Sequence, residues 1–354
     1  MYENVTYEDI LQRMLDKVPN NMDKREGSIV FDALASAAIE IQNTYIAIDT
    51  FLNETFADTA SREYLIRRAN ERGITPKSAS NAILKGVFAP ATVDVLGKRF
   101  SCGELNYIVT EKITNGEYQI QCETVGVEGN ANFGQMIPID YIEGLETAEL
   151  TEILIPGEDE EDTEVFRERY FKSFTSQAFG GNIADYKEKT NFINGVGGVK
   201  VTPVWNGGGT VKLTIIDSEF NVPTEELIEL VQNSIDPIEH SGEGVGLAPI
   251  GHVVTVVGVN GKTINVETTI TYQNGWDWES AKTYILNTID QYFKGLSKEW
   301  EETENLIIRI SQLESKILAC EGVLDIQGTT LNGSNSNLSL NTDEIPVRGT
   351  VNGN

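Results

Sequence analysis

The sequence predicts an α+β protein of several domains, and three observations lead to this class. The chain has 354 residues, which is more than a single hydrophobic core usually serves. Apolar residues follow a helical period at the start of the chain, form short strand-like runs in the middle, and mix both patterns afterwards. Clusters of Gly, Asn and Pro break up the later runs. We expect a helical, bundle-forming region over 1–81, a small β-rich domain over 82–159, and two compact α/β-type domains: a central one over 160–259 and a C-terminal α+β one over 260–354.

The N-terminal region contains a long predicted helix that runs from about Ser28 to about Phe56. Its apolar residues recur at alternating spacings of three and four, as in the seam of a coiled coil. The seam consists of Phe31, Leu34, Ala38, Ile41, Tyr45, Ile48 and Leu52. Further apolar residues beside it include Ile39 and Ile46, so the helix is expected to pack against more than one partner.

Two shorter helices are expected on either side of this long one. Thr6 with Asp9 resembles a capping box at the start of the first, over 6–18, and Gly73 suits the end of the other, over 60–72. These two helices are the alternative partners for the seam. The sequence leaves open whether the seam packs against them or against other protein chains.

The β-rich segment contains GNANFG at 129–134, which has the glycine spacing of a phosphate-binding loop. Gln135 and Met136 stand where such a loop needs Lys and then Ser or Thr, so we interpret the motif as a turn between strands. The acidic run at 157–164 lacks the alternating oxygen ligands of a calcium loop and is interpreted as a linker that leads into a helix.

The central segment is predicted to follow the order ααββαβ, with Asn182 as the cap of its second helix. The next segment is expected to begin with a hairpin, because Asn260-Gly261 stands between two β-rich runs and both residues tolerate positive φ. Two helices, over 276–296 and 304–320, then lead into strands and turns at the end of the chain.

Composition and motifs argue against several classes of function. The formal net charge of −27 disfavours binding to nucleic acid or to anionic membranes, and no apolar run is long enough to span a bilayer. The N-terminal residues have no signal-peptide pattern, and three widely spaced cysteines are typical of reduced thiols in the cytoplasm. The two histidines, His240 and His252, lie in no metal-binding or catalytic motif. We therefore expect no enzyme activity, no cofactor and no metal.

Four tryptophans keep a second class of function open. Trp276 and Trp278 flank Asp277 at a predicted helix start, Trp205 precedes a Gly-rich turn, and Trp300 lies in an acidic stretch. Packing at the ends of secondary-structure elements explains such positions, because an indole buries its body and keeps its N–H in water. The alternative is a glycan-binding tail or surface protein that uses exposed aromatic rings.

Read end to end, the chain resembles the baseplate J-like family of contractile phage tails and phage-tail-like bacteriocins. The resemblance rests on an ordered series of segments that covers nearly the whole length: REGSIVFDALASAAIEI, TASREYLIRRANERGITPKSASNA, VGVEGNANFGQMIPI, EDTEVFRERYFKSF, FGGNIADYKEKT, VKVTPVWNGGGTVKLTIID, LAPIGHVVTVVGV, GVLDIQG and EIPVRGTV. One departure is Ala60-Ser61, where family members often carry Gly after the small residue. The chain looks most like the shorter members from Gram-positive prophages.

What this resemblance implies is a structural role without catalysis. Such proteins form baseplate wedges, which relay the trigger from the receptor-binding fibres to contraction of the sheath. The implied partners are a second copy of the chain, a smaller wedge protein, neighbouring wedges, the sheath initiator and the central hub and spike. Assembly would take place in the cytoplasm of the producer cell, and the protein would then form part of the tail baseplate of the released particle. On this hypothesis the seam residues 31–52 form the wedge bundle.

Overall fold

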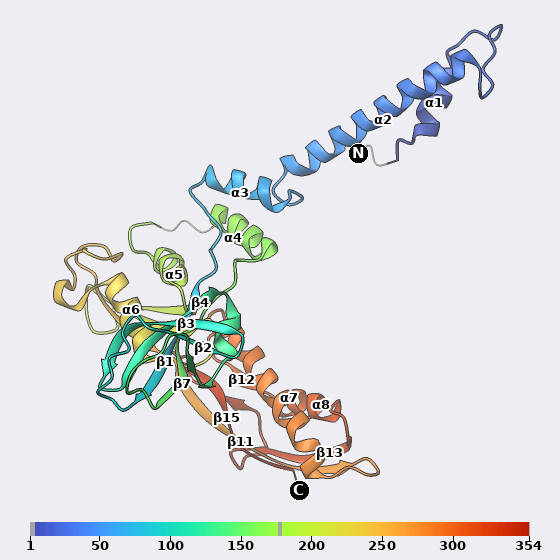
Figure 1. Ribbon diagram of the computed structural model, residues 1–354. Helices are drawn as coiled ribbons and strands as arrows, with labels where there is room; N and C mark the ends of the chain where they lie inside the picture. The colour runs from blue at the N-terminus through green and yellow to red at the C-terminus, as the bar shows by residue number, and fades with distance from the viewer. Residues whose placement is uncertain (1–3, 176–178, 354) are drawn as a thin grey trace. The chain divides into compact units, whose positions relative to one another are not determined.

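A computed structural model describes residues 4–175 and 179–353, and the chain divides into two compact units (Figure 1). The first unit comprises residues 1–77 and 161–175, and the second comprises 78–160 and 176–354. Helices and a succession of sheets confirm the predicted α+β multidomain class. The finer division into four domains stays a prediction.

The first unit is entirely helical in its described part. It consists of α1 (Tyr7–Asp16), α2 (Ile29–Thr55), α3 (Arg62–Asn70) and α4 (Thr163–Thr175). The Thr6 hydroxyl accepts a hydrogen bond from the Asp9 N–H, which satisfies a free donor in the first turn of α1. The turn after α3 reaches Gly73, whose positive φ of 73° suits a helix stop. These contacts confirm the predicted cap at Thr6 and the predicted stop at Gly73, although both helices are a few residues shorter than expected.

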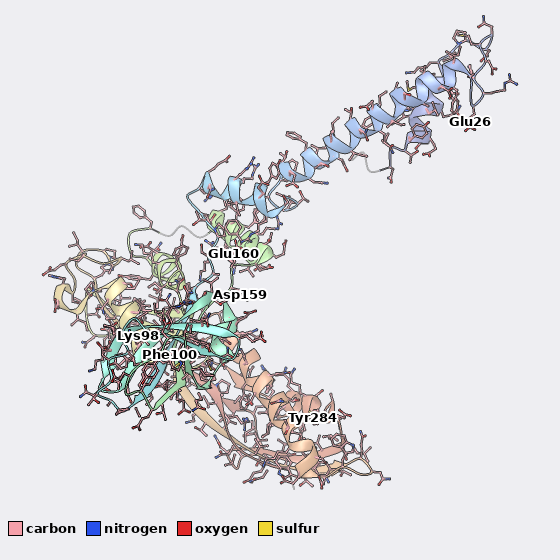
Figure 2. All side chains as sticks on the ribbon, viewed as in Figure 1. Glu26, Lys98, Phe100, Asp159, Glu160 and Tyr284 are labelled. Atoms are coloured by element: carbon pink, nitrogen blue, oxygen red, sulfur yellow. The ribbon has the colours of Figure 1, made fainter. Side chains whose placement is uncertain are left out.

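The β-rich part of the second unit is one curled sheet of seven strands in the order β5-β7-β1-β4-β3-β2-β6. The strands are β1 (Asn81–Ala89), β2 (Arg99–Cys102), β3 (Leu105–Thr114), β4 (Glu117–Val125), β5 (Gly134–Gln135), β6 (Ile137–Pro138) and β7 (Thr147–Ile155). Its two edge strands, β5 and β6, are separated in the chain only by Met136, so the sheet curls until its edges approach each other. Inward-pointing side chains such as Phe100, labelled in Figure 2, fill the interior.

The GNANFG motif lies between β4 and β5, where residues Val127–Ala131 form a short 3-10 helix, η1. Gly129 is buried, and a Cβ there would lie 2.9 Å from the Cβ of Ala82. Asn130 bonds the backbone of Gly157 in both directions: its amide nitrogen donates to the Gly157 carbonyl (2.9 Å), and its amide oxygen accepts from the Gly157 N–H (2.8 Å). The motif therefore clamps the start of the acidic linker and provides no phosphate loop.

The central part is a three-stranded sheet in the order β10-β9-β8. Its elements are α5 (Ile183–Asn191), β8 (Val196–Pro203), β9 (Thr210–Asp217), α6 (Glu225–Ile235), η2 (Ile238–His240) and β10 (Val253–Gly258). β8 and β9 form the expected antiparallel pair, whereas β10 runs parallel to β9. A parallel neighbour requires a crossover, and α6 supplies it. Asn182 caps α5 by accepting from the Asp185 N–H (2.8 Å), as predicted.

The C-terminal part packs two helices on a sheet of order β13-β11-β15. Its elements are β11 (Asn260–Tyr272), α7 (Trp278–Lys298), β12 (Ile307–Ile308), α8 (Ile310–Leu318), β13 (Val323–Leu331), β14 (Leu338–Ser339) and β15 (Glu344–Gly353). Tyr284, labelled in Figure 2, lies on α7. The predicted helix over 304–320 begins only at Ile310, because Ile307 and Ile308 pair with β14.

The predicted hairpin at Asn260-Gly261 is wrong. Both residues belong to β11, where they pair in parallel with Glu344 and Ile345 of the last strand. Neither has a positive φ. The strand before them, β10, belongs to a different sheet. The Asn-Gly signal is local, and here a long-range parallel ladder takes the backbone groups that a hairpin would have used.

Three of the buried titratable groups have raised pKa values. Burial of the Asp217 carboxyl at the end of β9 raises its pKa to about 6. Glu219 raises this pKa further, whereas the hydrogen bond from the Asn221 N–H (2.7 Å) and the charge of Lys294 oppose the shift. The three cysteines are free thiols, as expected, and burial raises the pKa of both Cys102 and Cys122.

Candidate assembly interface on helix α2

The candidate functional site is the apolar surface of α2. Ser28 caps the helix by accepting from the Phe31 N–H (3.2 Å), and the helix continues for 27 residues. At 1.5 Å per residue it is about 40 Å long, whereas the ten residues of α1 span about 15 Å. Helix α1 therefore cannot cover the whole of α2, and Figure 1 shows it beside only the first part.

Helix α1 packs against four of the seven residues of the predicted seam. Ile10, Leu11 and Leu15 of α1 form a small core with the fully buried Ala38, and Phe31, Leu34 and Tyr45 are partly buried around it. The chain's own first helix thus provides one neighbour for the seam, which was the alternative left open by the sequence. The structure brings these four seam residues together against α1.

The rest of the seam keeps much of its apolar surface in solvent. Ile41 and Ile48 are 38% and 39% exposed, and Leu52 is partly buried. Ile39 and Ile46, beside the seam, are 49% and 58% exposed. Single exposed apolar residues are ordinary on a protein surface, but several along one helix make it a candidate interaction surface.

These exposed residues form two stripes on α2. Ile39 and Ile46 are seven residues apart, as are Ile41 and Ile48, so each pair lies on one line along the helix. At about 100° per residue, the direction of Ala38 falls between the two lines. The helix therefore offers one apolar stripe on each flank of its α1-facing side, which is the geometry of a helix inside a bundle. Figure 2 shows side chains projecting from both sides of α2.

Phe51 is an exposed apolar residue of α2 that the seam pattern missed. Its side chain is 70% exposed, and it belongs to neither stripe. The heptad spacing could not identify it, because it lies off both stripes. The only signal in the sequence was its large aromatic side chain, and no spacing pattern supported it.

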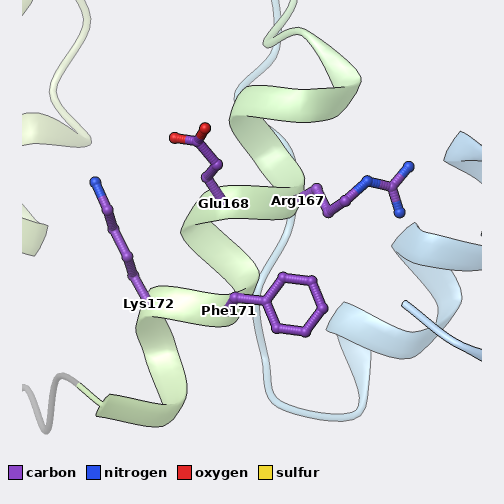
Figure 3. A pocket seen from close by; sticks show the side chains of 4 residues that line it. All are labelled: Arg167, Glu168, Phe171 and Lys172. Atoms are coloured by element: carbon purple, nitrogen blue, oxygen red, sulfur yellow. The ribbon is translucent and has the colours of Figure 1, made fainter. Parts of the chain in front are cut away.

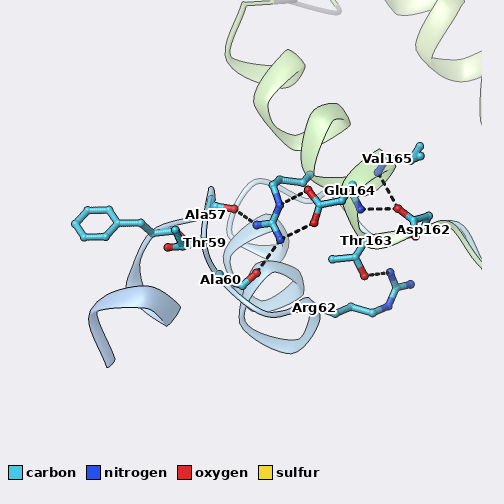
Figure 4. A network of polar contacts seen from close by, with 10 residues as sticks. Ala57, Thr59, Ala60, Arg62, Asp162, Thr163, Glu164 and Val165 are labelled. Atoms are coloured by element: carbon cyan, nitrogen blue, oxygen red, sulfur yellow. Dashed lines mark hydrogen bonds and ion pairs between the residues drawn. The ribbon is translucent and has the colours of Figure 1, made fainter. Parts of the chain in front are cut away.

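The base of α2 is fixed to α4 by a polar network (Figure 4). The Arg167 guanidinium donates to the carboxylate of Glu164 (3.0 and 3.2 Å), to the carbonyl of Ala60 (2.9 Å) and to that of Ala57. Arg62 of α3 donates to the Thr163 hydroxyl (3.3 Å). Arginine suits this role because its planar fork serves several acceptors at once. No sequence motif predicted this junction, because the residues it joins, such as Ala60 and Arg167, are about a hundred positions apart.

A second arginine, Arg169, holds the start of α4. It forms a two-bond pair with the nearly buried carboxylate of Glu161 (2.8 and 2.7 Å). Burial alone would raise the pKa of Glu161, but the bonds from Arg169 and from the Lys77 N–H (3.0 Å) outweigh it and leave the pKa below its usual value. The carboxylate is therefore held ionised, and the ion pair ties the linker to the helical unit.

A shallow hollow on α4 is lined by Arg167, Glu168, Phe171 and Lys172. Figure 3 shows Arg167 and Phe171 extending to one side of the helix and Glu168 and Lys172 to the other. A small-molecule site is concave and draws its lining from several elements. A hollow whose lining comes from one helix is a surface feature and no binding pocket.

The histidines and the possible metal ligands outside α2 were the other candidates for a site. Within 4–175 and 179–353, no cluster of His, Cys, Asp and Glu is arranged to hold a metal ion, and no helix is long and apolar enough to cross a membrane. His252 is bonded to the hydroxyl of the buried Tyr186 (2.8 Å), and His240 pairs with Glu243 on the surface (3.0 Å).

The tryptophans serve mainly in packing. Trp300 is buried, and its indole N–H donates to the Thr342 carbonyl (2.9 Å). Trp276 and Trp278 pack against the C-terminal core. Trp205 is 43% exposed and lies near the Lys212 ammonium. Three of the four rings thus have packing roles, and Trp205 is the exposed one.

Comparison with known proteins identifies the class to which this fold and surface belong. Residues 178–258 match the family model of the baseplate J-like central domain, and residues 264–354 match that of the baseplate J-like protein C-terminal domain. The chain is 37% identical to the phage-like element PBSX protein XkdT of Bacillus subtilis (strain 168), with 99% of this chain and 98% of that protein covered. It is 38% identical to the uncharacterized protein YqbT of the same organism over the same shares of the two chains.

The chain therefore belongs to the baseplate J-like family, and the predicted resemblance is confirmed. It is a phage or prophage tail baseplate protein. A more distant similarity, at 27% identity over 57% of this chain and 59% of the other, links it to the Mu-like prophage FluMu protein gp47 of Haemophilus influenzae. A cryo-EM structure of the anti-feeding prophage baseplate aligns with a TM-score of 0.42 at 7% identity, over 98% of this chain and 91% of that one.

Proposed function

We propose that this protein is a wedge component of the baseplate of a contractile tail, and that its copies join through α2. The observation that carries the proposal is the pair of exposed apolar stripes on a helix that α1 covers only in part. Membership of a baseplate family supplies the setting, because a baseplate is built from many copies held together by protein contacts.

The two stripes fit two neighbours. The Ile41/Ile48 stripe continues the seam and suits α2 of a second copy, whereas the Ile39/Ile46 stripe suits a helix of a smaller wedge partner. Each stripe would exclude its exposed isoleucine surface from water on assembly. In this arrangement the second unit faces the other components, namely neighbouring wedges, the sheath initiator and the central hub and spike.

The division of the chain supports a role in relaying the contraction trigger. The chain passes between its two units at 77/78, at 160/161 and at 175/176. A switch requires an element with two discrete arrangements, and compact units joined by short segments can exchange such arrangements without repacking their cores. The family points to a structural component and not to an enzyme, and the relay needs no chemistry.

The test is purification of the native particle through a tag on this chain. The chain is tagged at its C-terminus in the producing strain, recovered after induction, and analysed by mass spectrometry and negative-stain microscopy. Tail particles with sheath, tube and baseplate proteins at a fixed ratio to this chain would support the wedge assignment. Recovery of the chain alone, or with the tail absent, would refute it.

A further inference from the structure

The edge of the central sheet formed by β10 has a protected backbone. Strand β10 pairs with β9 on one side, where the Val253 N–H donates to the Gly209 carbonyl and the Val259 N–H to that of Ile215 (both 2.9 Å). Alternate residues, including Val254 and Val256, therefore turn their backbone groups away from β9. No strand within 4–175 or 179–353 pairs with this outer side.

Two side chains of the crossover segment occupy the outer side of β10. The Gln232 amide nitrogen donates to the Val254 carbonyl (3.0 Å), and the Gln232 amide oxygen accepts from the Val256 N–H (2.8 Å). The Asp236 carboxylate accepts from the Val254 N–H (2.9 Å). Thus three consecutive outward groups of the edge strand are satisfied by side chains.

The Gln232 amide takes the place of one residue of a missing strand. In a parallel ladder, a residue donates to the carbonyl of one residue of its neighbour and accepts from the N–H two positions further on. A side-chain amide carries the same donor and acceptor as a peptide group. Gln232 bonds Val254 and Val256 in this pattern, so it reproduces one rung of a fourth parallel strand.

The same residues also fix the loop that follows α6. Asp236 is 1% exposed, and its carboxylate accepts from the Ser241 hydroxyl (2.7 Å) and the Gly242 N–H (2.9 Å) as well as from Val254. The Gln232 amide also donates to the Asp236 carbonyl (2.6 Å). Together they join the end of α6, the loop and the strand edge in one network.

Exposed apolar side chains beside this edge would favour pairing with another chain if the backbone groups of β10 were unsatisfied. The loop and the strand start carry a set of apolar side chains that are 43% to 82% exposed: Ile238, Val245, Leu247, Ile250 and Val253. An unpaired strand edge beside apolar surface is a template for pairing with another chain. The risk of such pairing grows with the local concentration of the chain.

We propose that Gln232 and Asp236 close the β10 edge against strand addition by a second copy of this chain. Gln232 is the better residue to substitute, because its side chain is only partly buried and forms two of the three hydrogen bonds to the strand edge. The inference does not depend on the wedge role, since it concerns contacts within the second unit.

The test compares Gln232→Leu with the matched control Asn233→Ala, which changes the next, exposed residue of α6. Both are made in a chain that carries Ile41→Asp and Ile48→Asp, so that association through α2 does not contribute. Mass is followed by light scattering across a range of concentrations, and backbone exposure by hydrogen exchange of the segment 253–257. Thermal melting checks that each variant is folded. Gln232→Glu is a second variant, which keeps the acceptor for Val256 but replaces the donor to the Val254 and Asp236 carbonyls with an oxygen.

We expect Gln232→Leu to exchange the outward amides about tenfold faster than the control and to form dimers or larger species as concentration rises. Gln232→Glu should also expose the edge, because its second carboxylate oxygen repels the Val254 and Asp236 carbonyls. Equal mass and equal exchange for Gln232→Leu and the control would overturn the proposal. Faster exchange without any gain in mass would also overturn it, because the edge would then be open and yet unable to take a strand.

Discussion

The α2 interface can be tested by placing charge on one stripe at a time. In one variant Ile41 and Ile48 are changed to Asp, and in a second variant Ile39 and Ile46 are changed. A matched control introduces the same two charges on the polar side of the helix, through Ser36→Asp and Asn43→Asp, both exposed positions. Leu34 is left intact, because it packs against α1 and its loss would damage the helical unit itself.

The expected magnitude follows from the exposed fractions. Ile41 and Ile48 each leave a little over a third of the residue surface in solvent. Burying that remainder is worth roughly 1–2 kcal/mol for the pair, at about 1.5–3 kcal/mol for a whole side chain. An unpaired carboxylate forced into the interface costs several kcal/mol more. A loss of about 4 kcal/mol weakens association roughly a thousandfold, whereas the free energy of unfolding of the isolated chain should change by only about 1 kcal/mol.

The assay has two parts. Light scattering on the purified chain measures self-association, and a pull-down from the producing strain measures recovery of the other baseplate proteins. We expect the Ile41/Ile48 variant to lose the second copy and the Ile39/Ile46 variant to lose the smaller partner first. The control should behave as the unmodified chain. Normal mass and normal recovery for both stripe variants would refute the interface, and loss of assembly in the control would refute the argument from stripes.

Three further predictions concern polar groups within each of the two units. Asp217→Asn should raise the melting temperature at pH 8 but not at pH 4. In the unmodified chain the pKa of Asp217 is about 6 in the folded state, which is above its unfolded value. Its free energy of unfolding therefore falls by about 3 kcal/mol as pH rises from about 4 to 6, and the uncharged Asn avoids this loss. Glu161→Gln should destabilise the helical unit at pH 7 in urea unfolding, and the difference should shrink as pH falls below about 4, because the lowered pKa makes the bond to Arg169 a stabilising term only while the carboxylate is ionised. Asn130→Ala should cost about 1–3 kcal/mol and speed hydrogen exchange around Gly157, whose N–H and carbonyl lose their partner.

Each of these three predictions has a result that contradicts it. An Asp217→Asn variant equally stabilised at both pH values would show that burial of the charged form is not the cause. A Glu161→Gln effect that does not vary with pH would remove the ion pair from the account. If Asn130→Asp, which keeps an acceptor but no donor, preserves the slow exchange of the unmodified chain, the two-way clamp on Gly157 is not what orders the linker.

Local structure could be predicted from the sequence because its signals lie within a few residues of each other. Thr6, Ser28 and Asn182 each cap the helix that follows, as their hydroxyl or amide groups allow. The apolar spacing of α2 could be read in the same way, and so could membership of the baseplate J-like family, from an ordered series of short segments.

Contacts between residues far apart in the sequence could not be predicted. These contacts determined which secondary structure was formed where the local signals pointed to another. Asn260-Gly261 has a strong hairpin signal, yet it lies in a ladder with residues more than eighty positions later, because pairing with β15 satisfies its backbone groups. Residues 307 and 308 fit the apolar pattern of the following helix, but they form strand β12, which pairs with β14. The three contacts that close the β10 edge, like the Arg167 junction, are formed by groups that no spacing rule connects.

For the candidate interface on α2, too, the sequence determined one part and the tertiary structure the other. The sequence by itself determined that α2 is a long helix with too much apolar surface for solvent, because the period of its side chains depends only on local geometry. Tertiary structure alone decided which part of that surface remains free. Helix α1 packs with Phe31, Leu34, Ala38 and Tyr45 and is too short to cover the whole of α2. Ile41 and Ile48 therefore keep more than a third of their surface in solvent.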